Sequence, residues 1–258
     1  MTAVVVHHVT HGPADAPVLV LAGSLGSTQR MWDPIVPTLA EHLRVVTYDA
    51  RGHGLSPAPT GPYAIKDLAD DLVLLLDTVG VERAHLGGLS MGGMTAMRLA
   101  ARDPRRVGSM TLLCTSAQLG PAQGWLDRAD AVRAGGVASV APVIVERWLT
   151  PAAVRRDPAL VASLVEMISS SSDHGYAACC EAIAEMDLRP DLASITAPTL
   201  AIAGEQDPAT PPEHLRLIAE GIEGARLEVL SPAAHIAVLE QPAAVARLVL
   251  DHLAAHPV

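Results

Sequence analysis

The chain has 258 residues, of which 50% are hydrophobic and 18% charged, and this composition excludes a mainly disordered protein. Its 18 Lys and Arg residues against 28 Asp and Glu residues give a formal net charge of −10. An acidic surface of this kind repels nucleic acids and anionic membranes. We therefore expect a globular protein whose partner is a small molecule, with neither nucleic acid nor membrane bound.

Apolar runs such as residues 16–23 and 72–76 are interrupted by glycine or charge well before the roughly 20 residues that a membrane-spanning helix needs. Residues 1–10 lack the basic and long apolar regions of a signal peptide. The three cysteines, Cys114, Cys179 and Cys180, match neither a disulfide framework nor a zinc-binding pattern. The sequence thus predicts a cytoplasmic protein.

Short β-branched and apolar runs alternate with helical patterns in the first part of the chain. Strands are expected at residues 4–9, 18–22, 44–48, 84–89 and 109–114, and helices at residues 65–79 and 91–101. Strands that alternate with helices predict parallel crossovers and a sheet covered on both faces.

This alternation stops between about residues 117 and 187, where the pattern is helical throughout. It resumes with expected strands at 199–203 and 226–230 and helices at 212–221 and 243–255. Open α/β sheets bind ligands beyond the carboxyl ends of their strands. We therefore predict an α/β fold with a mostly parallel sheet, a core formed by residues 1–116 and 188–258, and a helical lid formed by residues 117–187.

The strongest chemical signal is the sequence Gly88-Leu89-Ser90-Met91-Gly92. This G-x-S-x-G pattern follows an expected strand and opens an expected helix, which is the context of a nucleophile elbow. The tight turn exposes the Ser90 hydroxyl, and the Met91 N–H at the start of the helix faces the negative charge that develops during acyl transfer. We predict Ser90 as the nucleophile and the Met91 N–H as an oxyanion donor.

A serine hydroxyl needs a histidine base that a carboxylate orients. Of the 11 histidines, His235 is favoured because it follows the last expected strand, and His53 is the rival after an earlier strand. Asp207 is the favoured acid because it follows strand 199–203 and precedes His235 in the order Ser, Asp, His. Glu205, two residues nearer the strand, remains the alternative acid.

A second oxyanion donor is expected in the loop that follows strand 18–22. The segment Gly23-Ser24-Leu25-Gly26 lies there, and the Leu25 N–H is the predicted donor. A serine nucleophile with two backbone donors performs acyl transfer to water without a metal or an organic cofactor. The residues alone therefore predict a serine hydrolase.

Several stretches resemble the α/β-hydrolase superfamily and, more narrowly, the 3-oxoadipate enol-lactonases of aromatic degradation by the β-ketoadipate pathway. The matching stretches are Ser24-Leu25-Gly26, Met31-Trp32-Asp33-Pro34, Tyr48-Asp49-Ala50-Arg51-Gly52-His53-Gly54, residues 88–93, Arg147-Trp148-Leu149-Thr150-Pro151, Gly175-Tyr176 with Cys180, and residues 204–212. Two positions depart from the lactonase pattern, which usually has Asn in place of Gly23 and a single cysteine in place of Cys179-Cys180.

The resemblance implies hydrolysis of the ring ester of 3-oxoadipate enol-lactone, a small substrate with a free carboxylate. A general carboxylesterase or a perhydrolase-like relative is the alternative, and a ligand receptor on the same fold is a third. Because Lys66 is the only lysine, an arginine must bind the carboxylate. The candidates are Arg30, Arg128, Arg133 and Arg147, with Arg133 preferred, and Trp125 and Trp148 are expected to contact the substrate.

Overall fold

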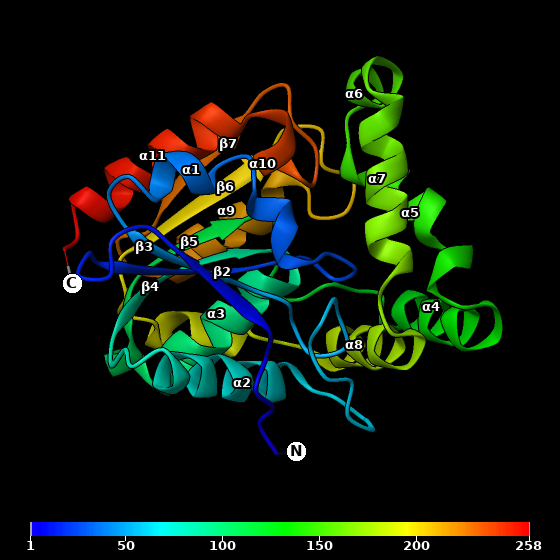
Figure 1. Cartoon of the computed structure of the whole chain (residues 1–258), viewed down its shortest axis with the longest axis horizontal. Helices are drawn as coiled ribbons and strands as arrows, with labels where there is room; N and C mark the ends of the chain where they lie inside the picture. Colours follow the sequence, from blue (N-terminus) through cyan, green and yellow to red (C-terminus); the bar gives the residue numbers. More distant parts are fainter. Residues whose placement is uncertain (1, 258) are drawn as a thin grey trace.

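Three strands are buried at every residue, namely β4 (Ala84–Leu89), β5 (Val107–Leu113) and β6 (Thr199–Gly204). Such strands are mostly apolar on both sides because helices cover both faces of a parallel sheet. They occupy the middle of a seven-stranded sheet in the computed structural model, which describes residues 2–257 (Figure 1). The strand order is β1-β3-β2-β4-β5-β6-β7.

The outer strands are β1 (His8–His11), β2 (Val18–Ala22), β3 (Arg44–Tyr48) and β7 (Arg226–Leu230). Every strand pair of the sheet is parallel except β1 with β3, which is antiparallel. The predicted α/β class and mostly parallel sheet are therefore confirmed.

The first strand begins later than the sequence predicts. Residues 4–9 were expected to be extended in the sheet, whereas β1 begins at His8. The reason is that side chains bind the preceding backbone: the Val4 N–H donates to Asp71 Oδ1 over 2.7 Å and the His7 N–H donates to Ser56 Oγ over 2.8 Å. These donors are satisfied outside a β ladder.

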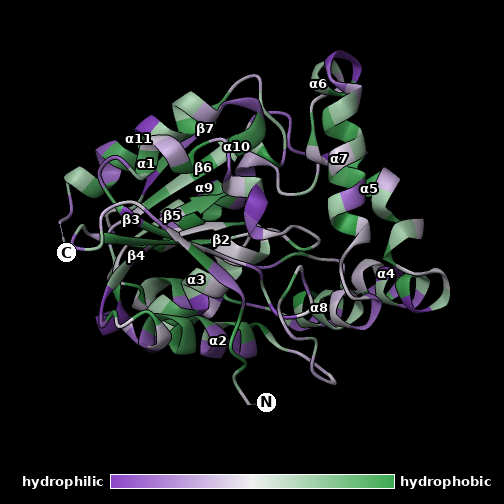
Figure 2. Cartoon of the chain, viewed as in Figure 1, coloured by the Kyte–Doolittle hydropathy of each residue, from purple (hydrophilic) through white to green (hydrophobic). Residues whose placement is uncertain are grey.

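Helices form a layer on each face of the sheet, with α2 and α3 on one face and α1 and α11 on the other (Figure 1). Hydrophobic residues colour much of the central strands between these layers (Figure 2), and the buried residues of α2 are mostly apolar. The helices that surround the sheet are α1 (Val36–Leu39), α2 (Ile65–Thr78), α3 (Met91–Arg102), α9 (Pro212–Gly221), α10 (Ala237–Glu240) and α11 (Pro242–Ala254). Short 3₁₀ turns are η1 (Gln29–Trp32), η2 (Pro104–Arg106), η3 (Val137–Ser139) and η4 (Arg189–Ser194).

Five consecutive helices between β5 and β6 stand beside the sheet, beyond one end of its strands (Figure 1). They are α4 (Ala122–Gly135), α5 (Ala141–Trp148), α6 (Pro151–Arg156), α7 (Pro158–Ser169) and α8 (Asp173–Glu185). The two ends of this segment meet, because the Leu188 N–H donates to the Ala117 carbonyl over 2.7 Å. The division of the chain into core and lid stays a prediction.

No helix within residues 2–257 is long and apolar enough to cross a bilayer. The three cysteines are buried free thiols. The cytoplasmic location expected from the sequence stays a prediction.

Two histidines are buried between the sheet and α11, away from the carboxyl ends of the strands. His85 of β4 and His252 of α11 are each 1% exposed. Burial disfavours their charged forms and lowers the pKa of each to about 4. Neighbouring histidines add to this, because the rings of His252 and His256 lie 5.0 Å apart between centroids.

These histidines predict loss of stability in mild acid. An unfolded histidine binds a proton near its ordinary pKa of 6.5, whereas the folded His252 does so only near 4. The contribution of His252 to the free energy of unfolding is therefore complete above pH 6.5 and falls as the pH drops toward 4. Between pH 7 and pH 5 this group alone lowers the free energy of unfolding by about 2 kcal/mol.

Urea unfolding of the wild type and of His252→Leu at both pH values measures this contribution. We expect the loss of unfolding free energy on acidification to be about 2 kcal/mol smaller in the variant, whatever its stability at pH 7. The exposed His42 serves as the control, since His42→Leu should keep the wild-type pH dependence. An unchanged pH dependence in His252→Leu would contradict the assignment.

Candidate active site

Ser90 lies at the turn between β4 and α3 in a strained backbone conformation. Its φ of 55° and ψ of −116° fall in a region that L-residues rarely occupy. Hydrogen bonds hold this turn: the Ser90 N–H donates to the Leu113 carbonyl over 3.0 Å, and Thr115 Oγ1 donates to the Ser90 carbonyl over 2.6 Å. Such a turn raises the serine side chain above the sheet, as a nucleophile elbow requires.

Two glycines make this turn possible because backbone passes too close for any side chain. A Cβ atom on Gly88 would lie 2.4 Å from the Gly92 carbonyl oxygen. A Cβ atom on Gly92 would lie 2.1 Å from the Ala22 carbonyl oxygen, in the neighbouring strand β2. The outer residues of the G-x-S-x-G pattern therefore follow from packing, independently of the chemistry at Ser90.

Asp207 and His235 form a buried pair on the loops that follow β6 and β7. His235 Nδ1 lies 2.8 Å from Asp207 Oδ2, and both side chains are almost fully buried. Burial alone would raise the pKa of Asp207. His235 and the hydrogen bonds from Thr210 outweigh burial, so the pKa of Asp207 is held below its usual value. Asp207 thus stays ionised and orients the His235 ring.

The alternative acid and base point elsewhere. Glu205 is exposed and accepts a hydrogen bond from Ser231 Oγ over 2.5 Å. His53 lies 2.8 Å from the Gly26 nitrogen and 3.0 Å from the Arg51 carbonyl oxygen, so both of its ring nitrogens are occupied. Of the candidates, the structure brings together Asp207 and His235.

Ser90 and His235 line the same cavity. Within residues 2–257 they form no direct hydrogen bond, and catalytic hydrogen bonds commonly tighten only when substrate binds. Thr210, which the sequence reasoning missed, donates from Oγ1 to Asp207 Oδ2 over 2.6 Å. Its signal was the spacing Asp207-x-x-Thr210, in which the Asp207 side chain also accepts the Thr210 N–H over 3.1 Å.

The loop after β2 presents backbone donors to the cavity. Ser24 and Leu25 line it, and no protein acceptor for the Leu25 N–H is found within residues 2–257. Met91 is the first residue of α3, so its N–H has no acceptor within the helix. Among the described residues, neither N–H group predicted for the oxyanion hole has a hydrogen-bond acceptor; Leu25 lines the cavity, and Met91 directly follows Ser90, which also lines it.

The cavity has a volume of about 250 Å³, which is below the roughly 300–1,000 Å³ typical of sites for drug-sized ligands. Its walls come from the loop after β2, the elbow and the helices α4, α5 and α8. Two arginines, Arg128 and Arg147, line it, and none of the described lining residues is acidic. In a chain of net charge −10, this small cavity is locally positive.

Comparison with known proteins places the chain in a family. Residues 16–242 match the family model described as the alpha/beta hydrolase fold. The chain belongs to the α/β-hydrolase family. The resemblance stated from its motifs is thereby confirmed.

Relatives of this hydrolase include enol-lactonases. It is 40% identical over 241 residues to 3-oxoadipate enol-lactonase 2 of Acinetobacter baylyi, covering 93% of this chain and 90% of that protein. The crystal structure of the enol-lactonase from Burkholderia xenovorans LB400 matches with a TM-score of 0.94 and 39% identity over 96% of both chains. RutD of Variovorax paradoxus, to which carbamate hydrolysis is provisionally ascribed, is 32% identical over 96% of both chains.

The arginine that the sequence analysis preferred for binding the carboxylate does not line the cavity. Arg133 lies outside the cavity lining of this hydrolase and pairs with Glu181 over 2.7 Å. Arg128 lines the cavity, with its guanidinium 4.5 Å from the ring centre of Trp125. On a helix of 3.6 residues per turn, positions 128 and 133 are about 140° apart, so α4 cannot turn both side chains to the same cavity.

Of the remaining substrate-binding candidates, three line the cavity and one does not. Trp125 and Trp148 line the cavity, as does Arg147, which donates to the Pro208 carbonyl over 3.1 Å. Arg30 is mostly exposed near Asp33, outside the lining.

The choice of acid is tested by paired amide substitutions. We expect Asp207→Asn to remain folded and to lose up to about 10⁴-fold in kcat, because His235 would adopt the wrong tautomer. Glu205→Gln, two residues away, should change kcat little. Steady-state kinetics with p-nitrophenyl acetate and circular dichroism of both variants provide the measurement. The assignment is wrong if Glu205→Gln is the damaging change.

Proposed function

We propose that this α/β hydrolase opens the ring ester of 3-oxoadipate enol-lactone to give 3-oxoadipate. Enol-lactonases, the relatives reported above, are carboxylic ester hydrolases, and the chain shares their fold over nearly its whole length. The observation that carries the proposal is the small cavity at Ser90 that holds two arginines and no lining carboxylate among the described residues. Such a cavity suits a compact ester that bears a negative charge.

The reaction begins when Ser90 Oγ attacks the lactone carbonyl carbon while His235 accepts the hydroxyl proton. Asp207 keeps the ring oriented through Nδ1 and stabilises the imidazolium. The N–H groups of Leu25 and Met91 bind the oxyanion of the tetrahedral intermediate. Losing one donor of this kind raises the barrier by roughly 3 kcal/mol.

Collapse of the intermediate breaks the ring C–O bond and gives an acyl-serine. The departing enol oxygen takes the proton from His235, and the enol then tautomerises to the ketone. Because the ester is part of a ring, the leaving group stays attached to the acyl chain. His235 then removes a proton from a water molecule as that water attacks the acyl-serine. The second tetrahedral intermediate collapses, and Ser90 Oγ leaves with the proton that His235 returns to it. The balance is one water consumed and no cofactor changed.

Arg128 is proposed to bind the substrate carboxylate. Its guanidinium stacks on Trp125, which keeps it inside the cavity, and it has no ion-pair partner within residues 2–257. Tyr176 lies in the same cavity, and its buried hydroxyl has no hydrogen-bond partner there either. A substrate carboxylate would accept bonds from both groups.

The helices α4–α8 are proposed to act as the lid predicted from the sequence. Trp125, Ile144, Trp148 and Tyr176 from these helices line the cavity beside Ser90. Apolar walls of this kind exclude water and strengthen the electrostatic contacts inside. Trp148 also anchors the loop that carries the base, since its carbonyl accepts the Ile236 N–H over 2.9 Å.

A general carboxylesterase would use the same serine chemistry without need of the arginines. A ligand receptor on this fold would need neither a buried ionised Asp207 nor its contact with His235. The retained pair therefore supports an enzyme, and the arginines support an acidic substrate.

Arg128→Met is expected to separate the acidic substrate from a neutral one. A hydrogen bond to a charged group contributes about 1.5–3 kcal/mol, so kcat/KM for the enol-lactone should fall about 10- to 100-fold. Hydrolysis of p-nitrophenyl acetate should change little, because that ester bears no carboxylate.

Arg133→Met is the matched control from the same helix and should affect neither substrate. Equal losses with both substrates in Arg128→Met would mean that Arg128 supports the fold of the cavity and does not bind the carboxylate. Initial rates for both variants and the wild type decide between these outcomes.

A further inference from the structure

His53 is buried beside the oxyanion loop, residues 23–26, and the reaction described above does not use it. It lies in the loop after β3, residues 49–56, and it is fully buried. Its Nε2 is 2.8 Å from the Gly26 nitrogen, and its Nδ1 is 3.0 Å from the Arg51 carbonyl oxygen.

These two neighbours define the protonation of the ring. A backbone N–H can only donate, so Nε2 must present its lone pair to Gly26. A carbonyl oxygen can only accept, so Nδ1 must carry the hydrogen. Burial lowers the pKa of His53 and outweighs the hydrogen bond with the Arg51 carbonyl and the charge of Asp49, which both act in the opposite direction. His53 is therefore neutral and in a single tautomer.

The Gly26 N–H is one of the few anchors of the oxyanion loop. The Gly23 carbonyl accepts the Gly92 N–H over 3.0 Å, and the Ser24 carbonyl accepts the Ser27 N–H over 3.0 Å. Gly26 has a φ of +85°, and its peptide nitrogen joins it directly to Leu25. A bond at this nitrogen fixes the plane of the peptide that follows Leu25.

We propose that His53 is a positioning residue that holds the oxyanion loop through the Gly26 N–H and so directs the Leu25 N–H toward the reacting carbonyl. It acts through the loop and touches no substrate atom. This inference rests on the proposed acyl transfer at Ser90, but not on the identity of the substrate.

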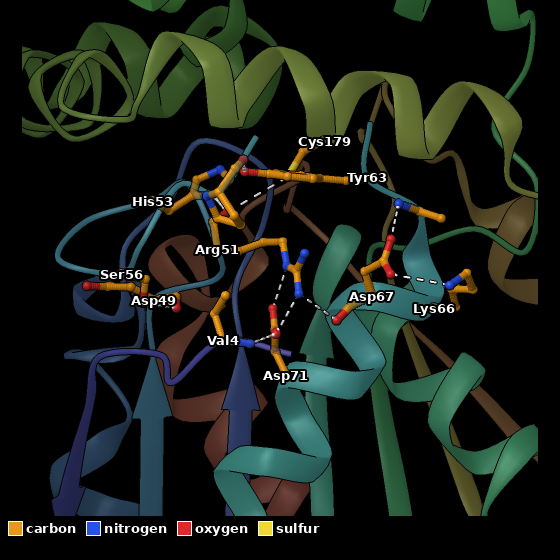
Figure 3. Close-up of polar contacts among 12 residues, drawn as sticks. Val4, Asp49, Arg51, His53, Ser56, Tyr63, Lys66, Asp67, Asp71 and Cys179 are labelled. Carbon is orange, nitrogen blue, oxygen red and sulfur yellow. Dashed lines mark hydrogen bonds and ion pairs between the residues drawn. The ribbon is translucent and has the colours of Figure 1, made fainter. Parts of the chain in front are cut away.

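The supports of His53 come from both sides of the loop. From the core side, Arg51 is fixed by Asp71, whose two carboxylate oxygens each lie 2.6 Å from a guanidinium nitrogen (Figure 3). From the side of the α4–α8 helices, the Tyr176 ring lies 6.3 Å from the His53 ring between centroids. Tyr176 also packs on Gly26, where an added Cβ would lie 3.1 Å from Tyr176 Cε2.

A close backbone contact completes this arrangement. A Cβ atom on Gly52 would lie 2.6 Å from the Gly175 Cα, and the Ser172 N–H donates to the Gly52 carbonyl over 3.0 Å. The position of His53 therefore depends on α8 as well as on the core. The ring has little freedom to move away from Gly26.

The first test needs no variant and no activity. Long-range nitrogen–proton NMR correlation of the wild type should show His53 Nδ1 protonated and Nε2 unprotonated at pH 7, with the Gly26 amide protected from hydrogen exchange. A protonated Nε2, or a Gly26 amide that exchanges as fast as exposed loop amides, would overturn the proposal even if the protein hydrolysed no ester.

The second test uses kinetics with p-nitrophenyl acetate. His53→Leu removes the acceptor, so kcat should fall roughly 10- to 100-fold with little change in KM, because oxyanion contacts strengthen in the transition state. Affinity for butylboronic acid, which forms a tetrahedral adduct on serine, should fall in parallel. His53→Gln places an amide oxygen near the site of Nε2 and should recover most of both losses.

His85→Leu is the matched control, since His85 is as buried as His53 but lies at the opposite end of β4 from Ser90. It should leave kcat per folded molecule unchanged. A His53→Leu variant with wild-type kcat, or equal losses in the Leu and Gln variants, would show that His53 only fills space. A wild type that hydrolyses no ester would instead contradict the proposed acyl transfer.

Discussion

Ser90 has a backbone conformation that residues other than glycine rarely adopt, and the packing around it leaves no room for it to relax. The turn is confined between Gly92, which touches the Ala22 carbonyl of β2, and Thr115, which bonds the Ser90 carbonyl. Strain of about 1–3 kcal/mol persists at such a residue only where neighbouring structure imposes it. The buried strands β2, β4 and β5 impose it here, so the fold positions the nucleophile before any substrate arrives.

The second fixed point is the buried Arg51–Asp71 ion pair beneath the residue 49–56 loop (Figure 3). Breaking a buried pair by removing one partner typically costs about 3–5 kcal/mol, so this ion pair anchors the loop to α2. It contacts the oxyanion loop through His53 and α8 through Gly52. One anchored loop thereby connects the core, a proposed oxyanion donor and the helices that wall the cavity.

The sequence predicted the features that depend on local order along the chain. The sequence of strand, glycine, serine and helix around Ser90 predicts the tight turn that is observed there. The order Ser, Asp, His led to Asp207 and His235, which are in contact in the structure. The central strands lie within two residues of their predicted positions, because a strand that is buried on both faces is mostly apolar.

What the sequence could not predict depends on how one element faces another. Arg128 and Arg133 are arginines of the same helix, and the sequence does not distinguish them. Only the rotation of α4 against the core directs Arg128 and not Arg133 to the cavity. His53 resembled a rival base until its two ring contacts were known. Residues 4–7 had a strand composition, but Asp71 and Ser56, distant in sequence, bind their backbone instead.

The most direct measurement of the central claim is the specificity of the wild-type protein. Purified protein should be given 3-oxoadipate enol-lactone, p-nitrophenyl acetate and a small N-unsubstituted carbamate, and kcat/KM determined for each. The account predicts that the enol-lactone is favoured by at least about 10-fold, the lower end of what a charge-assisted contact to its carboxylate contributes. Equal or faster turnover of the neutral ester or of the carbamate would contradict it.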